Sequence, residues 1–158
     1  MRIAKAVCLV FVCQLLWMST ARAQEVFAAP VPSQILTAKK VFIANGGLEG
    51  FVSSDAYIVG QDRGYNQFYG TFQKSTRFQL VATPAEADLV LEISTRIASG
   101  AQSNLRLTIY ETKSHYVLWR MDSLIEIAAR QVTFKRNFDT AVTRLASNFE
   151  KLAAPPQP

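Results

Sequence analysis

Apolar and polar residues alternate along residues 78–119, and this alternation predicts the strands of a β-sheet. The clearest strand covers residues 105–111, where apolar side chains on one face alternate with polar side chains on the other. The inward residues are Leu105, Leu107 and Ile109, and the outward residues are Arg106, Thr108 and Tyr110. We therefore expect this strand to bury one face in the core and to turn a polar face outward.

Further strands are predicted at residues 41–44, 77–82 and 89–97, and at residues 116–121 together with 124–128. The bulky run at 41–44 is expected to be buried on both faces and to end at Asn45-Gly46-Gly47. The short turn at 112–115 makes the strands beside it antiparallel neighbours, because a parallel crossover needs a longer connection.

Two helices are predicted from apolar positions three and four residues apart. In residues 65–75 the stripe consists of Tyr65, Phe68, Tyr69 and Phe72, and core packing is favoured for these aromatics over the lining of a groove. Residues 133–152 predict a longer amphipathic helix that begins at a capping Thr133 and lies across the sheet.

A single helical turn is predicted between two of the strands. Thr83 is expected to cap it, Pro84 occupies its first position, and Glu86 can return a hydrogen bond to the cap. Asp88 is expected to help cap the same turn. We interpret this segment as a structural corner.

The start of the chain has the pattern of an export signal. Arg2 and Lys5 precede an apolar run, and Ala21-Arg22-Ala23 supplies the cleavage pattern. We expect cleavage after Ala23 and an exported protein, either periplasmic or secreted. Residues 24–38 are then an extended lead-in, residues 39–152 a single domain, and residues 153–158 a disordered tail. The domain is predicted to be α+β, with a mixed sheet of about five strands and helices mainly on one face.

Charge and cysteine content exclude several classes of protein. Both cysteines, Cys8 and Cys13, lie in the leader, so no disulfide or cysteine metal site is expected in the mature chain. Three of the 17 basic residues also lie there, and the net charge falls from +5 to +2, too low for nucleic-acid binding. The apolar run of about a dozen residues is shorter than the ~20 that span a bilayer, so membrane contact is expected to be peripheral at most.

The sequence contains no motif that identifies a catalytic or metal-binding site. The only histidine, His115, stands in a predicted turn, and no cofactor motif is present, so no catalytic residue, metal ligand or cofactor is predicted. Two alternatives to a binding protein stay open. One is a small hydrolase built on carboxylates or on the loop at 48–64, and the other is a structural subunit that self-associates through its strands. Self-association predicts a size that depends on concentration.

The segment FQLVATPAEADLVLEI, followed by LRLTIYETK and VLW, resembles a theme of bacterial envelope proteins. Over residues 39–152 the chain is similar to the amino-terminal domain of TolB proteins and to the periplasmic domain of CsgG-like proteins. The resemblance implies an accessory role in envelope assembly or transport without catalysis. It also implies that the strand at 41–44 lies beside the strand at 89–93.

These observations predict a non-enzymatic, exported binding or accessory module that contacts a protein partner in the cell envelope. An exposed strand edge is the expected mode of contact. The candidate partner-binding residues are Arg106, Thr108 and Tyr110 on the outward face of the 105–111 strand, and Tyr57 in the loop before the first helix.

Overall fold

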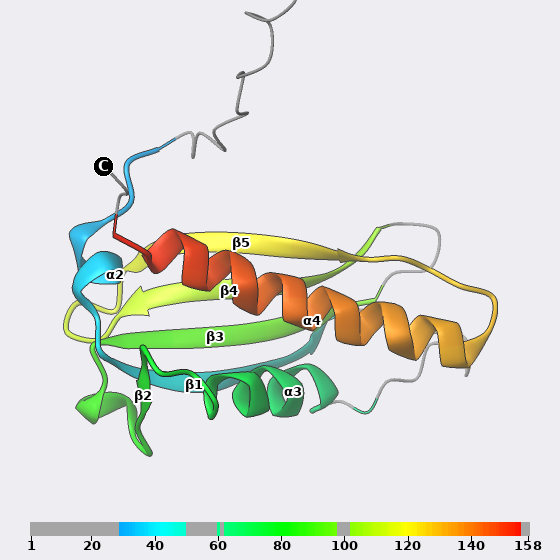
Figure 1. Ribbon diagram of the computed structural model, residues 1–158, viewed down its shortest axis with the longest axis horizontal. Coiled ribbons are helices and arrows are strands. Elements are labelled where there is room, and N and C mark those ends of the chain that lie inside the picture. The colour runs from blue at the N-terminus through cyan, green and yellow to red at the C-terminus, as the bar shows by residue number, and fades with distance from the viewer. Residues whose placement is uncertain (1–28, 50–59, 61, 98–101, 156–158) are drawn as a thin grey trace, which may run out of the picture. The chain divides into compact units, whose positions relative to one another are not determined.

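The computed structural model describes residues 29–49, 60, 62–97 and 102–155. By its contacts the chain divides into two units, Met1–Pro30 and Val31–Pro158, and every described helix and strand belongs to the second. In that unit the two longer helices lie against one face of a five-stranded sheet (Figure 1). The α+β domain with a mixed sheet is thus confirmed.

The sheet has the order β2-β1-β3-β4-β5. β1 is parallel to both of its neighbours, whereas β3, β4 and β5 form an antiparallel meander. The implied pairing of the first strand with the strand at 89–93 is confirmed, since Val41 lies opposite Leu89. The strands are β1 (Lys40–Glu49), β2 (Gln79–Leu80), β3 (Leu89–Arg96), β4 (Ser103–Glu111) and β5 (Val117–Ile125).

The core lies between this sheet and the helices α3 (Arg63–Phe72) and α4 (Gln131–Ala153). Both helices form because their apolar positions recur every three or four residues. α4 buries its apolar stripe, whereas α3 buries Phe68 and Phe72 and leaves Tyr65 and Tyr69 partly buried. The three phenylalanines of α4, Phe134, Phe138 and Phe149, are fully buried. At roughly 2 kcal/mol for each buried phenylalanine, α4 contributes a large part of the domain's stability.

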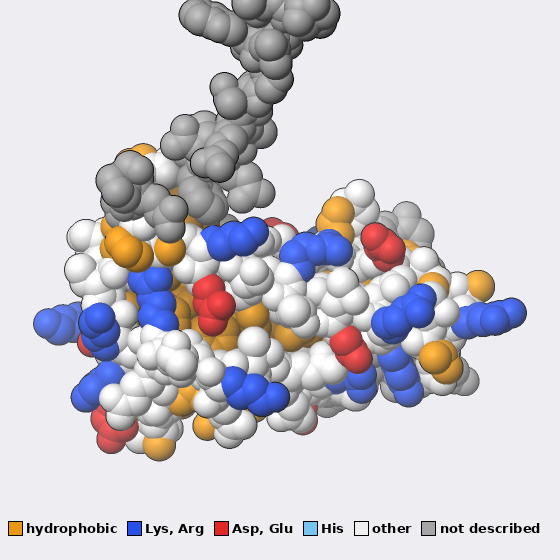
Figure 2. All heavy atoms as spheres, in the orientation of Figure 1, with side chains coloured by type: hydrophobic (Ala, Val, Ile, Leu, Met, Phe, Trp, Pro, Cys, Tyr) orange, Lys and Arg blue, Asp and Glu red, His pale blue; other side chains and the backbone are white. Residues whose placement is uncertain are grey.

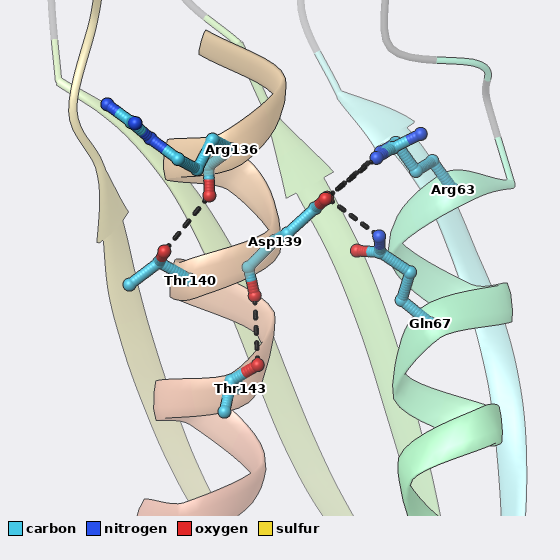
Figure 3. A network of polar contacts seen from close by, with 6 residues as sticks. All are labelled: Arg63, Gln67, Arg136, Asp139, Thr140 and Thr143. Atoms are coloured by element: carbon cyan, nitrogen blue, oxygen red, sulfur yellow. Dashed lines mark hydrogen bonds and ion pairs between the residues drawn. The ribbon is translucent and has the colours of Figure 1, made fainter. Parts of the chain in front are cut away.

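A polar contact joins α3 to α4 above this core (Figure 3). Arg63 donates from Nη2 to both carboxylate oxygens of Asp139, at 2.8 and 2.9 Å. Gln67, one turn further along α3, donates to the same carboxylate at 2.7 Å. Asp139 therefore links the two helices that cover the sheet.

β1 is longer than the sequence pattern predicted, and it is not buried on both faces. Val41 and Ile43 are buried, but Phe42 and Ala44 on the other side are only half-buried. The strand continues through Gly46 and Gly47 because the pairing with β3 shifts register there, which is a β-bulge. A Cβ on Gly46 would lie 3.0 Å from the Ser94 side chain, and Gly47 has φ +77, so glycine suits both positions.

Other local predictions were wrong in detail. The lead-in contains a short helix, α2 (Ser33–Thr37), and the strand predicted at 77–82 is reduced to the two residues of β2. Thr83 and Pro84 do occupy the predicted cap and first positions of the turn, but the Thr83 side chain makes no capping hydrogen bond, and Thr133 lies inside the last helix. The turn at 83–86 is a 3-10 helix, η3 (Pro84–Glu86), without a side-chain cap, and α4 begins after Arg130 instead. Instead of two segments at 116–121 and 124–128, the structure has one continuous strand, β5, which ends at Ile125.

Candidate binding surface

The sheet has one face without α3 and α4, which we call the helix-free face. Strand register places the polar side chains of β3, β4 and β5 there in rows. One row runs from Glu92 through Thr108 to Arg120. The next runs from Ser94 through Arg106 to Asp122, so positive and negative groups from three strands lie side by side.

Arg106 is held in place on this face by an ion pair. Its Nε lies 3.0 Å from Oδ1 of Asp122 on β5. Asn104, two residues before Arg106 on β4, donates to the same oxygen at 2.9 Å. The pair is partly exposed, so we expect it to position Arg106 more than to stabilise the fold.

Tyr110 is also held in place. Its hydroxyl donates to Oε1 of Glu92 at 3.2 Å. Burial raises the pKa of Tyr110 above its ordinary 10.0, and the negative charge of Glu92 raises it further, while Arg120 acts in the opposite direction. The phenol therefore stays neutral and keeps its donor directed at Glu92 at physiological pH.

The structure brings three of the four predicted candidates together. Arg106, Thr108 and Tyr110 share the helix-free face of β4, but Thr108 is only 3% exposed and offers little surface to a partner. Tyr57 falls outside the described residues. Sequence reasoning missed Glu92, Arg120 and Asp122 as members of this surface. Their alternation along β3 and β5 indicated the face, but only the register between strands shows which side chains meet.

β5 forms one margin of the sheet. In the part of the chain that the structure describes it pairs only with β4, and its nine residues make a long edge. Val117 and Leu124 are about half exposed on it, at 48% and 49%. The opposite margin, β2, has two residues and offers little backbone for another strand.

A cavity of about 430 Å³ lies elsewhere, where α2 meets the turn between β4 and β5. Lys39, Asp88, Glu111 and Lys113 are among the residues that line it. Asp88 does not cap η3 as predicted. Its Oδ2 accepts the backbone N–H groups of Lys39 and Lys40, each at 2.8 Å.

These two hydrogen bonds, first that of Lys40 and then that of Lys39, lower the pKa of Asp88 below 3.8. The carboxylate thus joins the start of β1 to the start of β3, which is a structural role. Two lysines and two acids around the cavity balance in charge and favour no class of ligand.

The described segments contain no assembled metal site. Within them no three His, Cys, Asp or Glu side chains gather in a way that could hold a metal ion. His115 is exposed in the turn after β4, where its φ of 59 fits a tight turn.

The helix-bearing side carries lysine and arginine side chains spread over the whole visible surface, with acidic side chains between them (Figure 2). This distribution differs from the continuous basic stripe of nucleic-acid-binding proteins. None of the described helices is both long enough and apolar enough to cross a membrane.

No known family model matches the chain, and no curated protein does. Among solved structures it is similar to a DUF330 protein from Xanthomonas campestris, with 12% identity and a TM-score of 0.44 over 85% of this chain and 90% of that one. It is also similar to the PelC dodecamer from Paraburkholderia phytofirmans, with 12% identity and a TM-score of 0.44 over 69% and 85%. The LpoB C-terminal domain from Salmonella enterica gives 11% identity and a TM-score of 0.41 over 62% and 94%.

All three solved structures come from bacteria. None of them is a TolB or CsgG protein. The resemblance to those two families therefore stays a prediction from the sequence.

Proposed function

We propose that the protein is a non-enzymatic accessory module of the bacterial cell envelope that binds a protein partner through the helix-free face of its sheet. The export signal predicted at residues 1–23 supports the compartment. The arrangement of Arg106 and Tyr110 on β4 is the observation that carries the proposal.

Arginine and tyrosine are among the residue types that most often dominate the energy of protein interfaces. Here each is already held by an acidic neighbour, Arg106 by Asp122 and Tyr110 by Glu92. A side chain that is fixed before binding loses less rotational freedom when the partner docks. The face therefore offers two preorganised anchors between charged groups of both signs.

The test is capture of the partner from crosslinked cells of the native host that express the full-length sequence with an affinity tag. We expect one envelope protein to be recovered reproducibly with the wild type. Its recovery should fall at least about tenfold with Arg106→Ala combined with Tyr110→Ala, because these truncations remove both anchors.

The matched control is Arg144→Ala, which truncates an exposed arginine on α4. It should leave recovery unchanged. Equal recovery with the Arg106 and Tyr110 variant would contradict the proposal, provided that circular dichroism shows the variant to be folded.

A further inference from the structure

The pattern of apolar and charged side chains along β5 is nearly symmetric about the middle of the strand. The strand reads VLWRMDSLI, with Met121 in the middle. Arg120 and Asp122 stand on either side of it, and aliphatic residues occupy both ends. A strand of this kind is complementary in charge to an antiparallel copy of itself.

Two copies of β5 centred on Met121 would place Arg120 of each opposite Asp122 of the other. Both side chains lie on the helix-free face, since Arg120 is opposite Thr108 and Asp122 is opposite Arg106 on β4. The pairing produces two charge pairs related by a two-fold axis.

The groups needed for this pairing are accessible in the single chain. Arg120 and Asp122 are both exposed, and no ion pair of Arg120 occurs within the described residues. Asp122 accepts its two hydrogen bonds, from Arg106 and Asn104, on Oδ1. Its other oxygen, Oδ2, is therefore able to accept from an arginine of a second copy.

The ends of the strand fit the same register. A bulge brings Val117 opposite Tyr110, and so onto the helix-free face, where Leu124 lies at the other end of β5. Pairing around Met121 brings Val117 of one copy near Leu124 of the other. Two half-exposed aliphatic side chains are thereby covered at each end.

Edge strands are usually protected against pairing by lysine, proline or charges that repel a second copy. β5 has neither lysine nor proline, and its two charges have opposite signs at positions that attract a copy. An unrelated strand would need to supply the same spacing of acid and base, which a second copy of this chain already has.

The geometry points to a homodimer in which β5 of one copy pairs antiparallel with β5 of another around a two-fold axis at Met121. This inference goes beyond the proposed function and does not depend on it. The dimer joins the two sheets into one, with the helices of both copies on one side. The two helix-free faces then form a single surface.

Sedimentation velocity over a wide concentration range tests the dimer, using protein purified from cells that express the full-length sequence. The wild type is expected to approach twice the monomer mass as its concentration rises. Arg120→Asp places two acids opposite each other and should weaken the dimer at least about tenfold. Arg144→Asp makes the same change of charge on α4 and should behave as the wild type.

A mixture of two charge-reversed variants tests the register in which the two β5 strands pair. Asp122→Arg alone should also be monomeric, whereas a mixture of folded Arg120→Asp and Asp122→Arg restores both charge pairs and should form a heterodimer. A wild type that stays monomeric at every concentration, or an Arg120→Asp protein that dimerises like the wild type, overturns the inference. A mixture of the two folded variants that stays monomeric overturns the register.

Discussion

At the scale of single residues, Asp88 shows how a carboxylate that sequence patterns assign to one role serves another. Its backbone partners, Lys39 and Lys40, lie 49 and 48 residues away along the chain. A local sequence motif cannot predict a contact between residues that are so far apart in the chain. The sequence did predict a corner at this place, and the structure adds that Asp88 ties the corner to β1.

Replacing Asp88 by asparagine should lower the free energy of unfolding by about 1 kcal/mol at neutral pH, because two backbone N–H groups lose a charged acceptor. Its folded pKa lies below the ordinary 3.8. The ionised carboxylate therefore contributes its full stabilisation at pH values above the ordinary 3.8. This contribution is lost as the pH falls through the lower folded pKa.

Urea unfolding at several pH values measures this effect. The difference between the wild type and Asp88→Asn should shrink as the solution becomes acidic, while Glu86→Gln, an exposed acid in the same corner, should show little difference at any pH. A gap that stays constant down to the most acidic condition would refute the role of the carboxylate.

Tyr110 offers a second measurement at this scale. Replacing Glu92 by glutamine removes the negative charge beside the phenol, so the pKa of Tyr110 should move down toward 10.0 while burial keeps it above that value. Phenolate absorbance, with Tyr110→Phe to identify the signal, records the shift. Because the folded pKa is raised, the contribution of Tyr110 to stability is fully present below 10.0 and is lost as the pH rises through the folded pKa. A titration that Glu92→Gln leaves unchanged would show that the two groups do not interact.

At the scale of elements, periodicity predicted most of the fold. The alternation in β4 and the apolar stripes of α3 and α4 gave the right elements, because each buries one face against the core. Periodicity failed at Asn45-Gly46-Gly47, which is typical of a turn. The glycines there serve a bulge inside β1 that allows β3 to approach closely, and this requirement comes from a strand distant in sequence.

The contact between α3 and α4 makes a prediction at this scale. Asp139→Asn weakens the hydrogen bonds from Arg63 and Gln67, and we expect it to lower the free energy of unfolding by about 1 kcal/mol, since the ion pair is partly exposed. Thermal unfolding should show a decrease of about 4 °C for a domain of this size. Glu150→Gln, an exposed acid on the same helix, is the control. Equal midpoints for the two variants would contradict the role of Asp139.

At the scale of the whole molecule, the two faces of the sheet have different roles. The face under α3 and α4 supplies the stability, and the helix-free face supplies the groups that a partner can contact. The sequence predicted which residues of β4 turn outward. It gave no means to predict that Glu92, Arg120 and Asp122 stand beside them, because strand order and register depend on contacts across the whole domain.

Site-specific crosslinking from the helix-free face tests the central claim most directly. A photo-crosslinking residue in place of Arg96, an exposed position at the end of β3, reports what lies against this face in living cells of the native host. We predict an adduct with one envelope protein, lost when Arg106 and Tyr110 are also replaced by alanine, and no such adduct from position 144. The absence of any adduct from position 96, or the same adduct from both positions, would contradict partner binding by this face.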